Sequence, residues 1–207
     1  MNAHRTPRDR LPEALIEFYG LAPLPREGGR FRQTWAGPPR PDGRPEGTAI
    51  VMLLTAGPGD FCALHRLPTD EIWHFYTGDP LTLLLLSEGG SRPEGGSRPE
   101  SGSLPEGGAR LDAGGHPDDG GRAEGAEGRS ARTVVLGPDV LGGQHVQFTV
   151  PAGTWMAAEV ADGGAWTLFG CTMAPGFTFA DYEHGDAAEL AARFPQEAAR
   201  IAALSRP

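Results

Sequence analysis

Apolar residues in this chain come in short runs that are separated by glycine, proline and aspartate. Apolar runs of about four to eight residues bounded by such turn formers predict β-strands, and many short strands at this spacing predict a sandwich or a squat barrel. The pattern therefore indicates an all-β fold rather than an α/β sheet. Nine strands are expected, at residues 29–35, 48–55, 61–66, 71–76, 81–86, 133–136, 145–150, 154–160 and 165–173.

Three stretches follow a helical period instead. Residues 11–19 place Leu15, Phe18 and Tyr19 on one side, which is typical of a short amphipathic helix. Residues 187–194 and 196–204 predict two further helices, separated by Pro195 because proline ends or kinks a helix.

The segment 88–130 breaks the apolar pattern. Its unit Glu-Gly-Gly-Ser-Arg-Pro at 88–93 recurs at 94–99 and more loosely at 100–105 and 106–111. Such a composition cannot bury enough apolar surface to offset the conformational entropy lost on folding. A solenoid of six-residue coils would need an apolar residue in each turn, and only Leu104 and Leu111 are available. We therefore expect a single domain over residues 1–207, interrupted by a flexible, low-complexity loop insertion at 88–130.

Net charge and targeting signals limit the possible binding partners and the cellular location of the protein. The formal net charge is −9, and about −5 remains when the insertion is left out, so no basic stripe is available for a nucleic acid. The start of the chain has no apolar core of signal-peptide length, and no run approaches a membrane span. Two cysteines without a secretory signal fit reduced thiols, which predicts a cytoplasmic protein that binds neither nucleic acid nor membrane.

Missing residue types exclude several chemistries. The chain has no lysine, which excludes Schiff-base catalysis, and its only asparagine is Asn2, which excludes a Cys-His-Asn triad. All serines lie at Ser87, in the insertion or at Ser205, so no serine nucleophile is expected in the folded part. The glycine-rich phosphate-binding motifs of nucleotide enzymes are also missing from the sequence.

Residues 59–78 carry a motif with defined spacing: Gly59, five residues, His65, one residue, Leu67, three residues, Glu71, six residues and Gly78. The spacing resembles the first motif of the cupin barrel, in which two histidines and a glutamate point into one pocket. Here Leu67 replaces the second histidine.

The surrounding residues narrow this resemblance to one family. The segment HRLPTDEIWHFYTGDPL at 65–81 resembles the Cupin_5 family, also called DUF985, of the RmlC-like cupin superfamily. Four further blocks agree with it in order, at residues 27–35, 48–55, 147–155 and 170–183. The resemblance implies a single cupin β-barrel, that is a double-stranded β-helix or jelly roll, and a homodimer.

The second cupin motif is incomplete. Pro151-Ala-Gly153 matches it, but Met156 stands at the histidine position and His145 at the expected glycine position. Of the four usual metal ligands the chain thus keeps His65 and Glu71, and a thioether favours soft copper over iron, manganese or zinc. No cofactor is firmly predicted. If a divalent metal is bound, its ligands would be His65 and Glu71, completed by His145 or Gln147.

Period-two alternation assigns the candidate site. It puts Glu71, Trp73 and Phe75 on one face of their strand and His74 on the other, against a second sheet or a partner subunit. In the cupin arrangement the glutamate faces inward, so His65 and Glu71 are the predicted catalytic pair. The predicted ligand-binding residues are Arg32, Gln33, Trp73, Gln147 and Met156.

Structural interpretations stand beside these functional ones. His65 alone could be a hydrogen-bonded structural histidine, and Glu71 could form a solvated turn pair with Asp70. A cavity carboxylate would have Arg66 or Arg32 as a natural partner. Cys171 is flanked by apolar residues and fits the core better than a nucleophile.

Three function classes follow. The first is a cupin that binds a sugar-like or polar metabolite and isomerises, epimerises or cleaves it by metal-independent proton transfer between His65 and Glu71. The second is a metal-dependent oxygenase or decarboxylase, which the lost ligands count against. The third is a non-catalytic ligand-binding or sensor protein.

Overall fold

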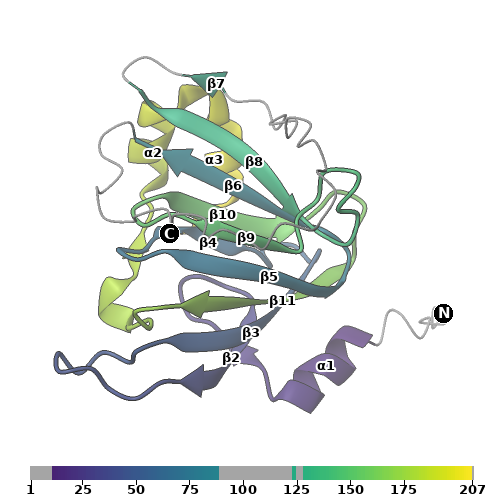
Figure 1. The fold of residues 1–207 in the computed structure, drawn as a ribbon. Coiled ribbons are helices and arrows are strands. Elements are labelled where there is room, and N and C mark those ends of the chain that lie inside the picture. Colours follow the sequence, from purple (N-terminus) through teal and green to yellow (C-terminus); the bar gives the residue numbers. More distant parts are fainter. Residues whose placement is uncertain (1–10, 89–122, 125–127, 207) are drawn as a thin grey trace, which may run out of the picture.

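The computed structural model describes residues 11–88, 123–124 and 128–206 (Figure 1). Most of the predicted insertion at 88–130 therefore lies outside the described residues. The rest of the described chain is dominated by strands. They are β1 (Ala22–Pro23), β2 (Arg30–Ala36), β3 (Thr48–Thr55), β4 (Cys62–Arg66), β5 (Glu71–Gly78), β6 (Leu81–Ser87), β7 (Ala123–Glu124), β8 (Ser130–Leu136), β9 (Gln147–Val150), β10 (Trp155–Val160), β11 (Trp166–Met173) and β12 (Glu183–His184).

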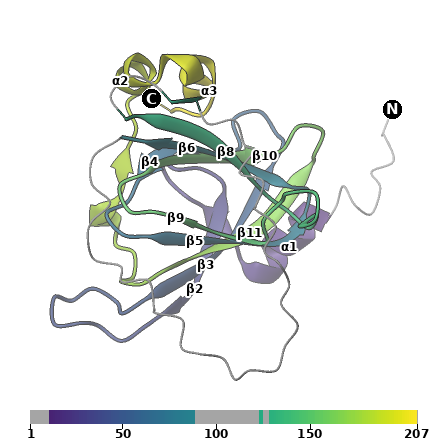
Figure 2. The same cartoon turned by 45° about the horizontal axis from the view of Figure 1, so that its top comes forward.

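The strands form two six-stranded antiparallel sheets. The first sheet has the order β1-β2-β3-β11-β5-β9, and the second has the order β12-β4-β10-β6-β8-β7. Figure 2 shows the two sheets as facing layers. All nine expected strands are present, with ends shifted by a few residues. The strands that were not expected, β1, β7 and β12, have two residues each, which is too short for any periodicity.

The main core lies between the sheets, where the inward side chains of both layers meet. In β5 the predicted alternation is confirmed, because Glu71 and Trp73 are buried while Tyr76 on the other face is half exposed. Trp73 stacks on Phe169 of the neighbouring β11, with ring centroids 5.2 Å apart. Burial of large apolar side chains such as these supplies most of the favourable free energy of folding.

Strand β6 is buried on both faces. Leu81, Leu83 and Leu85 point into the core between the sheets, and Leu84 and Leu86 point outward. The outer side is covered by α2 (Ala187–Arg193) and α3 (Ala198–Ala203), which lie above the second sheet in Figure 2. This double burial explains why the run is continuously apolar instead of alternating.

Helix α1 (Leu11–Tyr19) covers part of the outer face of the first sheet (Figure 1). Its Leu15 and Ile16 pack against Leu53 of β3 and Trp166 of β11. The helix spans the residues that the sequence pattern predicts, but Phe18 is 79% exposed, and Ile16 packs on the sheet with Leu15 and Tyr19 in its place.

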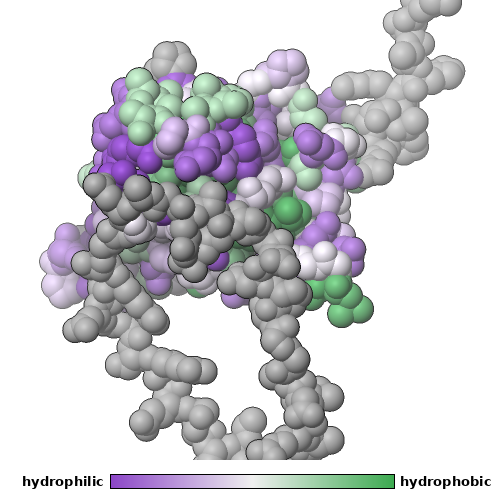
Figure 3. Space-filling view, turned by 90° about the horizontal axis from the view of Figure 1, so that it is seen from above, coloured by the Kyte–Doolittle hydropathy of each residue, from purple (hydrophilic) through white to green (hydrophobic). Residues whose placement is uncertain are grey.

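The surface above α2 and α3 is mixed in character. Seen from that side, hydrophilic residues alternate with small pale-green areas, and the space-filling view shows no large strongly hydrophobic area over these helices (Figure 3). Among the described helices, none is long and apolar enough to cross a membrane.

Candidate functional site

A cavity of about 60 Å³ lies between the two sheets. Both sheets contribute to its wall, together with the loop before β2 and the segment after β11. The lining side chains are Leu24, Glu27, Phe31, Gln33, Thr48, Ile50, His65, Leu67, Glu71, Cys171, Met173, Phe177 and Phe179. Most of this wall is apolar, so the few polar groups determine which ligand the cavity accepts.

His65 enters the cavity from β4 and is only 1% exposed. Its Nδ1 lies 2.7 Å from the carbonyl oxygen of Ala63, which can only accept a hydrogen bond. Nδ1 therefore carries the proton, and Nε2 is left as an unprotonated acceptor. Burial lowers the pKa of His65, an effect that the Glu71 carboxylate partly opposes. The imidazole stacks on the Tyr182 ring, with centroids 5.4 Å apart, which holds its orientation.

Glu71 enters from the opposite sheet at the start of β5 and is 7% exposed. The indole Nε1 of Trp73 donates a hydrogen bond of 2.9 Å to its Oε2, and the Cys171 thiol donates another. Burial raises the pKa of Glu71 to about 7, because the charged form loses its hydration, while His65 and these donors act in the other direction. The carboxyl group can therefore gain or lose a proton near neutral pH.

A second carboxylate in the cavity, Glu27, was missed by the sequence analysis. Burial raises its pKa to about 7, and the Cys62 thiol donates a hydrogen bond to it. Glu27 and Glu71 line the same cavity, and the charge of Glu27 raises the pKa of Glu71. The cavity thus holds two carboxyl groups that repel each other when both are charged.

The loop that carries Glu27 depends on Gly28. This glycine has a φ of 100°, in the region that glycine adopts readily, and a Cβ there would lie 2.3 Å from the Phe61 carbonyl oxygen. The close approach lets the Ala63 N–H donate to the Glu27 carbonyl at 2.7 Å, which anchors the loop on β4. The signal in the sequence was the Glu-Gly-Gly triplet at 27–29, which the family resemblance includes.

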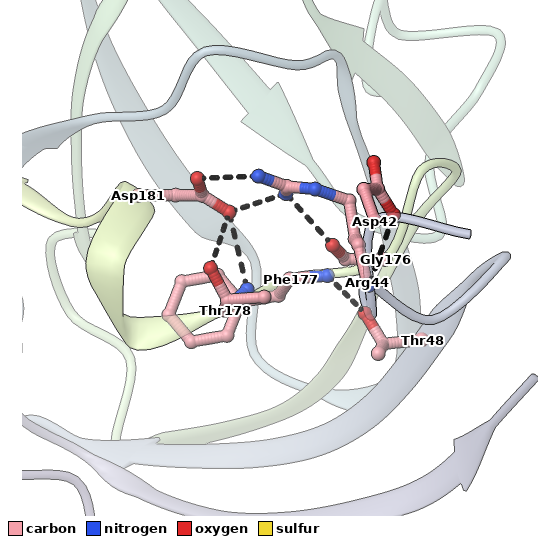
Figure 4. Close-up of polar contacts among 7 residues, drawn as sticks. All are labelled: Asp42, Arg44, Thr48, Gly176, Phe177, Thr178 and Asp181. Carbon is pink, nitrogen blue, oxygen red and sulfur yellow. Dashed lines mark hydrogen bonds and ion pairs between the residues drawn. The ribbon is translucent and has the colours of Figure 1, made fainter. Parts of the chain in front are cut away.

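The segment after β11 closes one side of the cavity, and Figure 4 shows the contacts that hold it. Asp181 accepts hydrogen bonds from both terminal nitrogens of Arg44, with Nη2 at 2.8 Å from Oδ1. Arg44 also donates to the Gly176 carbonyl at 3.1 Å, and the Phe177 N–H donates to the Thr48 hydroxyl at 2.9 Å. We call residues 176–181 the strap. It contributes Phe177 and Phe179 to the cavity wall.

The predicted ligand-binding residues separate into three groups. Gln33 lines the cavity with His65 and Glu71. Trp73 and Met156 are buried in the core behind the wall, with Trp73 hydrogen-bonded to Glu71 and Met156 paired with His65 across β10 and β4.

Arg32 and Gln147 lie outside this cavity. The Arg32 guanidinium donates to the carbonyl of Tyr19 at 2.9 Å, which is on the α1 side of the sheet. Gln147 is exposed at a position paired with the outward-facing His74. Arg66 pairs with Glu183 through bonds of 2.6 and 2.7 Å and not with Glu71.

The donor set does not fit the usual four-ligand cupin metal centre. Leu67 stands at one ligand position, and the Met156 thioether at another is packed in the core. Within residues 11–88, 123–124 and 128–206, no three His, Cys, Asp or Glu side chains are arranged to hold a metal ion. His145, the third predicted donor, is not on the cavity wall and packs edge-on against Phe148 instead.

Comparisons with known proteins agree with the fold. The family Cupin_5, described as the cupin superfamily (DUF985), matches residues 13–185. The crystal structure of a protein from Shewanella oneidensis is 28% identical, with a TM-score of 0.68 over 94% of this chain and 97% of that one. A hypothetical protein from Leishmania major is 27% identical, with a TM-score of 0.68 over 94% and 98%. No curated protein matches the sequence.

Proposed function

Because the chain belongs to the Cupin_5 (DUF985) family of the cupin superfamily, we propose that it is a small-molecule-binding cupin barrel with His65 and Glu71 as a proton-transfer pair. The reaction class that this pair suits is an isomerisation, epimerisation or elimination of a polar or sugar-like metabolite. No metal is required for such proton transfer.

One observation carries the proposal: a proton acceptor and a proton donor face one cavity from opposite sheets. The unprotonated Nε2 of His65 can remove a proton, since its Nδ1 is held by Ala63 and its lowered pKa keeps it neutral. The Glu71 carboxyl, with its pKa raised to about 7, can return a proton on the other side. General acids and bases work best when their pKa lies near the working pH.

The cavity volume limits the substrate. A cavity needs about 10–15 Å³ to hold one water molecule. The cavity here, with about 60 Å³, therefore accommodates only a small molecule. The apolar wall, formed by side chains such as Leu24, Ile50 and Met173, excludes water from the pair and strengthens electrostatic interactions there.

The test is deuterium exchange, because proton transfer at carbon can be detected without knowing the product. Panels of small sugars, hydroxy acids and amino compounds are incubated with the protein in D₂O, and deuterium uptake is measured by mass spectrometry. We expect His65→Ala and Glu71→Gln each to slow the exchange by about 10²-fold or more. The rate should also fall above pH 7, as Glu71 loses its proton.

His74→Ala is the matched control, since His74 faces outward and bonds to Thr172 at 3.1 Å. Full exchange in the His65/Glu71 double variant would contradict the proposal. Binding without any exchange would favour the non-catalytic ligand-binding alternative instead.

A further inference from the structure

The polar groups of the cavity are mostly hydrogen-bond acceptors. Glu27 and Glu71 each present a carboxyl group, and His65 presents its unprotonated Nε2. The donors that meet these carboxylates, from Cys62, Trp73 and Cys171, come from the protein itself. A ligand with N–H donors would complement these acceptors, while the Gln33 amide and the Thr48 hydroxyl also belong to the wall.

No positive side chain lines the cavity in the part of the chain that the structure describes. The chain has no lysine, and the arginines near the site have other partners. Arg44 pairs with Asp181, and Arg206 donates to the carbonyls of Gly59 and Phe61 at 2.7 and 3.1 Å. An anionic ligand would meet two carboxyl groups and no compensating charge.

The arrangement also leaves a repulsion that a cation would relieve. Glu27 and Glu71 interact unfavourably when both are ionised, and burial makes each charge costly. His65, at 1% exposure, lines the same cavity, and its Nε2 has no described hydrogen bond. These three groups line one small cavity whose wall is mostly apolar.

We propose that the cavity binds a small organic cation with a primary ammonium group, anchored by Glu27 and reaching Glu71 and His65. An ammonium group carries three N–H donors, so it can bond to the Glu27 carboxylate and still present donors towards Glu71 and His65. The hydrocarbon part of the ligand packs against apolar wall residues, including Phe31, Ile50 and Phe177.

This inference rests on the proposed function, because it uses the same cavity, and it specifies the class of ligand. It adds Glu27 as the residue that selects that class. The proton-transfer proposal does not need Glu27, so the two can fail separately.

The experiment compares three small probes of similar size on the wild-type protein: propylammonium, propan-1-ol and propanoate. Binding is measured by isothermal titration or ligand-observed NMR at pH 8.5, after dialysis against a chelator. At this pH both carboxyl groups, with pKa values of about 7, are mainly ionised. We expect propylammonium to bind at least about tenfold more tightly than either of the other probes.

Glu27→Gln should weaken propylammonium binding by about tenfold or more, because an uncharged amide replaces the anchoring carboxylate. Glu17→Gln is the matched control, since Glu17 is exposed on α1. The cation proposal would be overturned if propan-1-ol or propanoate bound as tightly as propylammonium or more tightly. If that binding were lost in Glu71→Gln, the proposed pocket would still stand. Unchanged propylammonium binding in Glu27→Gln would also overturn the cation proposal, and so would undetectable propylammonium binding to the wild type. The proposed proton transfer is tested separately by deuterium exchange.

Discussion

At the scale of single residues, the site is defined by what burial does to a few ionisable groups. Glu27 and Glu71 are placed among apolar side chains, so their pKa values rise to about 7. His65 is buried in the same space and its pKa falls. Desolvation, the leading cause in each case, disfavours whichever form is charged, so all three groups favour the neutral form.

These shifts predict how stability depends on pH. A carboxyl group with a raised pKa in the folded state stabilises the fold below its unfolded value of about 4.5, and that stabilisation is lost as pH rises towards 7. Glu71→Gln removes one of these titrating carboxyl groups, so the variant does not lose that part of its stability as the pH rises. We expect the variant to gain about 1–3 kcal/mol in the free energy of unfolding relative to wild type between pH 5 and pH 8.

Urea unfolding at several pH values measures this difference. The contribution of His65 does not cancel fully in this comparison, because the Glu71 carboxylate partly opposes the lowering of the His65 pKa; that contribution acts only as pH falls below about 6.5. Glu17→Gln should show no such pH-dependent gain. A constant difference between Glu71→Gln and wild type at every pH would show that Glu71 does not titrate in this range.

At the scale of elements, the strap belongs to no sheet and is held by side-chain hydrogen bonds, together with a backbone bond of 2.9 Å from the Gly176 N–H to the Pro45 carbonyl. Asp181 receives two hydrogen bonds from Arg44, and the same carboxylate accepts from the N–H and hydroxyl groups of Thr178. Arg44 lowers the pKa of Asp181, so the pair persists well into the acidic range. Phe177 and Phe179 are the aromatic side chains of the strap, and Phe179 is 69% exposed.

Removal of the Arg44 guanidinium should loosen the strap. In Arg44→Gln we expect the amide hydrogens of Phe177 and Thr178 to exchange with solvent several-fold faster. The reason is that Asp181 and the Gly176 carbonyl lose their bonds to Arg44, so the strap no longer keeps these amides on their acceptors. Hydrogen exchange with mass spectrometry or NMR measures this change. Arg40→Gln, an exposed change in the same β2–β3 connection, should leave the rates unchanged. Equal exchange in both variants would show that the strap is held by its apolar contacts.

At the scale of the whole molecule, one core and two outer clusters stabilise the two sheets. The outer face of the first sheet is covered by α1 only in part, and His74 and Tyr76 stack on this face beyond the helix. Tyr76 is 50% exposed, and its hydroxyl lies over Gly170 of β11, where a Cβ would clash. This face is where we propose that two chains meet in a homodimer.

Sedimentation velocity tests the dimer. We expect a species of about twice the chain mass of 21.9 kDa, and Tyr76→Asp should shift it towards monomer, because a charge would have to be desolvated in the contact. Leu141→Asp is the control, since Leu141 is fully exposed in the turn between β8 and β9. A single 21.9 kDa species in the wild type would exclude the dimer.

Local patterns in the sequence were enough to predict the longer strands, helix α1 and part of the candidate site. The strands of the sheets follow from apolar runs between turn formers, and α1 follows from its apolar stripe. His65 and Glu71 were predicted from motif spacing together with period-two alternation, and the structure places both in one cavity. These features depend on neighbours within a few residues, which the sequence displays directly.

Only the tertiary structure decided which distant groups share the cavity. Glu27 reaches it because Gly28 allows its loop to press on Phe61, and Arg44 meets Asp181 across 137 positions of sequence. Neighbouring side chains of a strand point to opposite faces, so Gln33 of β2 lines the cavity while Arg32 lies on the α1 side of the sheet. The packing of the two sheets sets the burial of Glu27, His65 and Glu71, and with it their shifted pKa values, and no local window of the sequence contains that information.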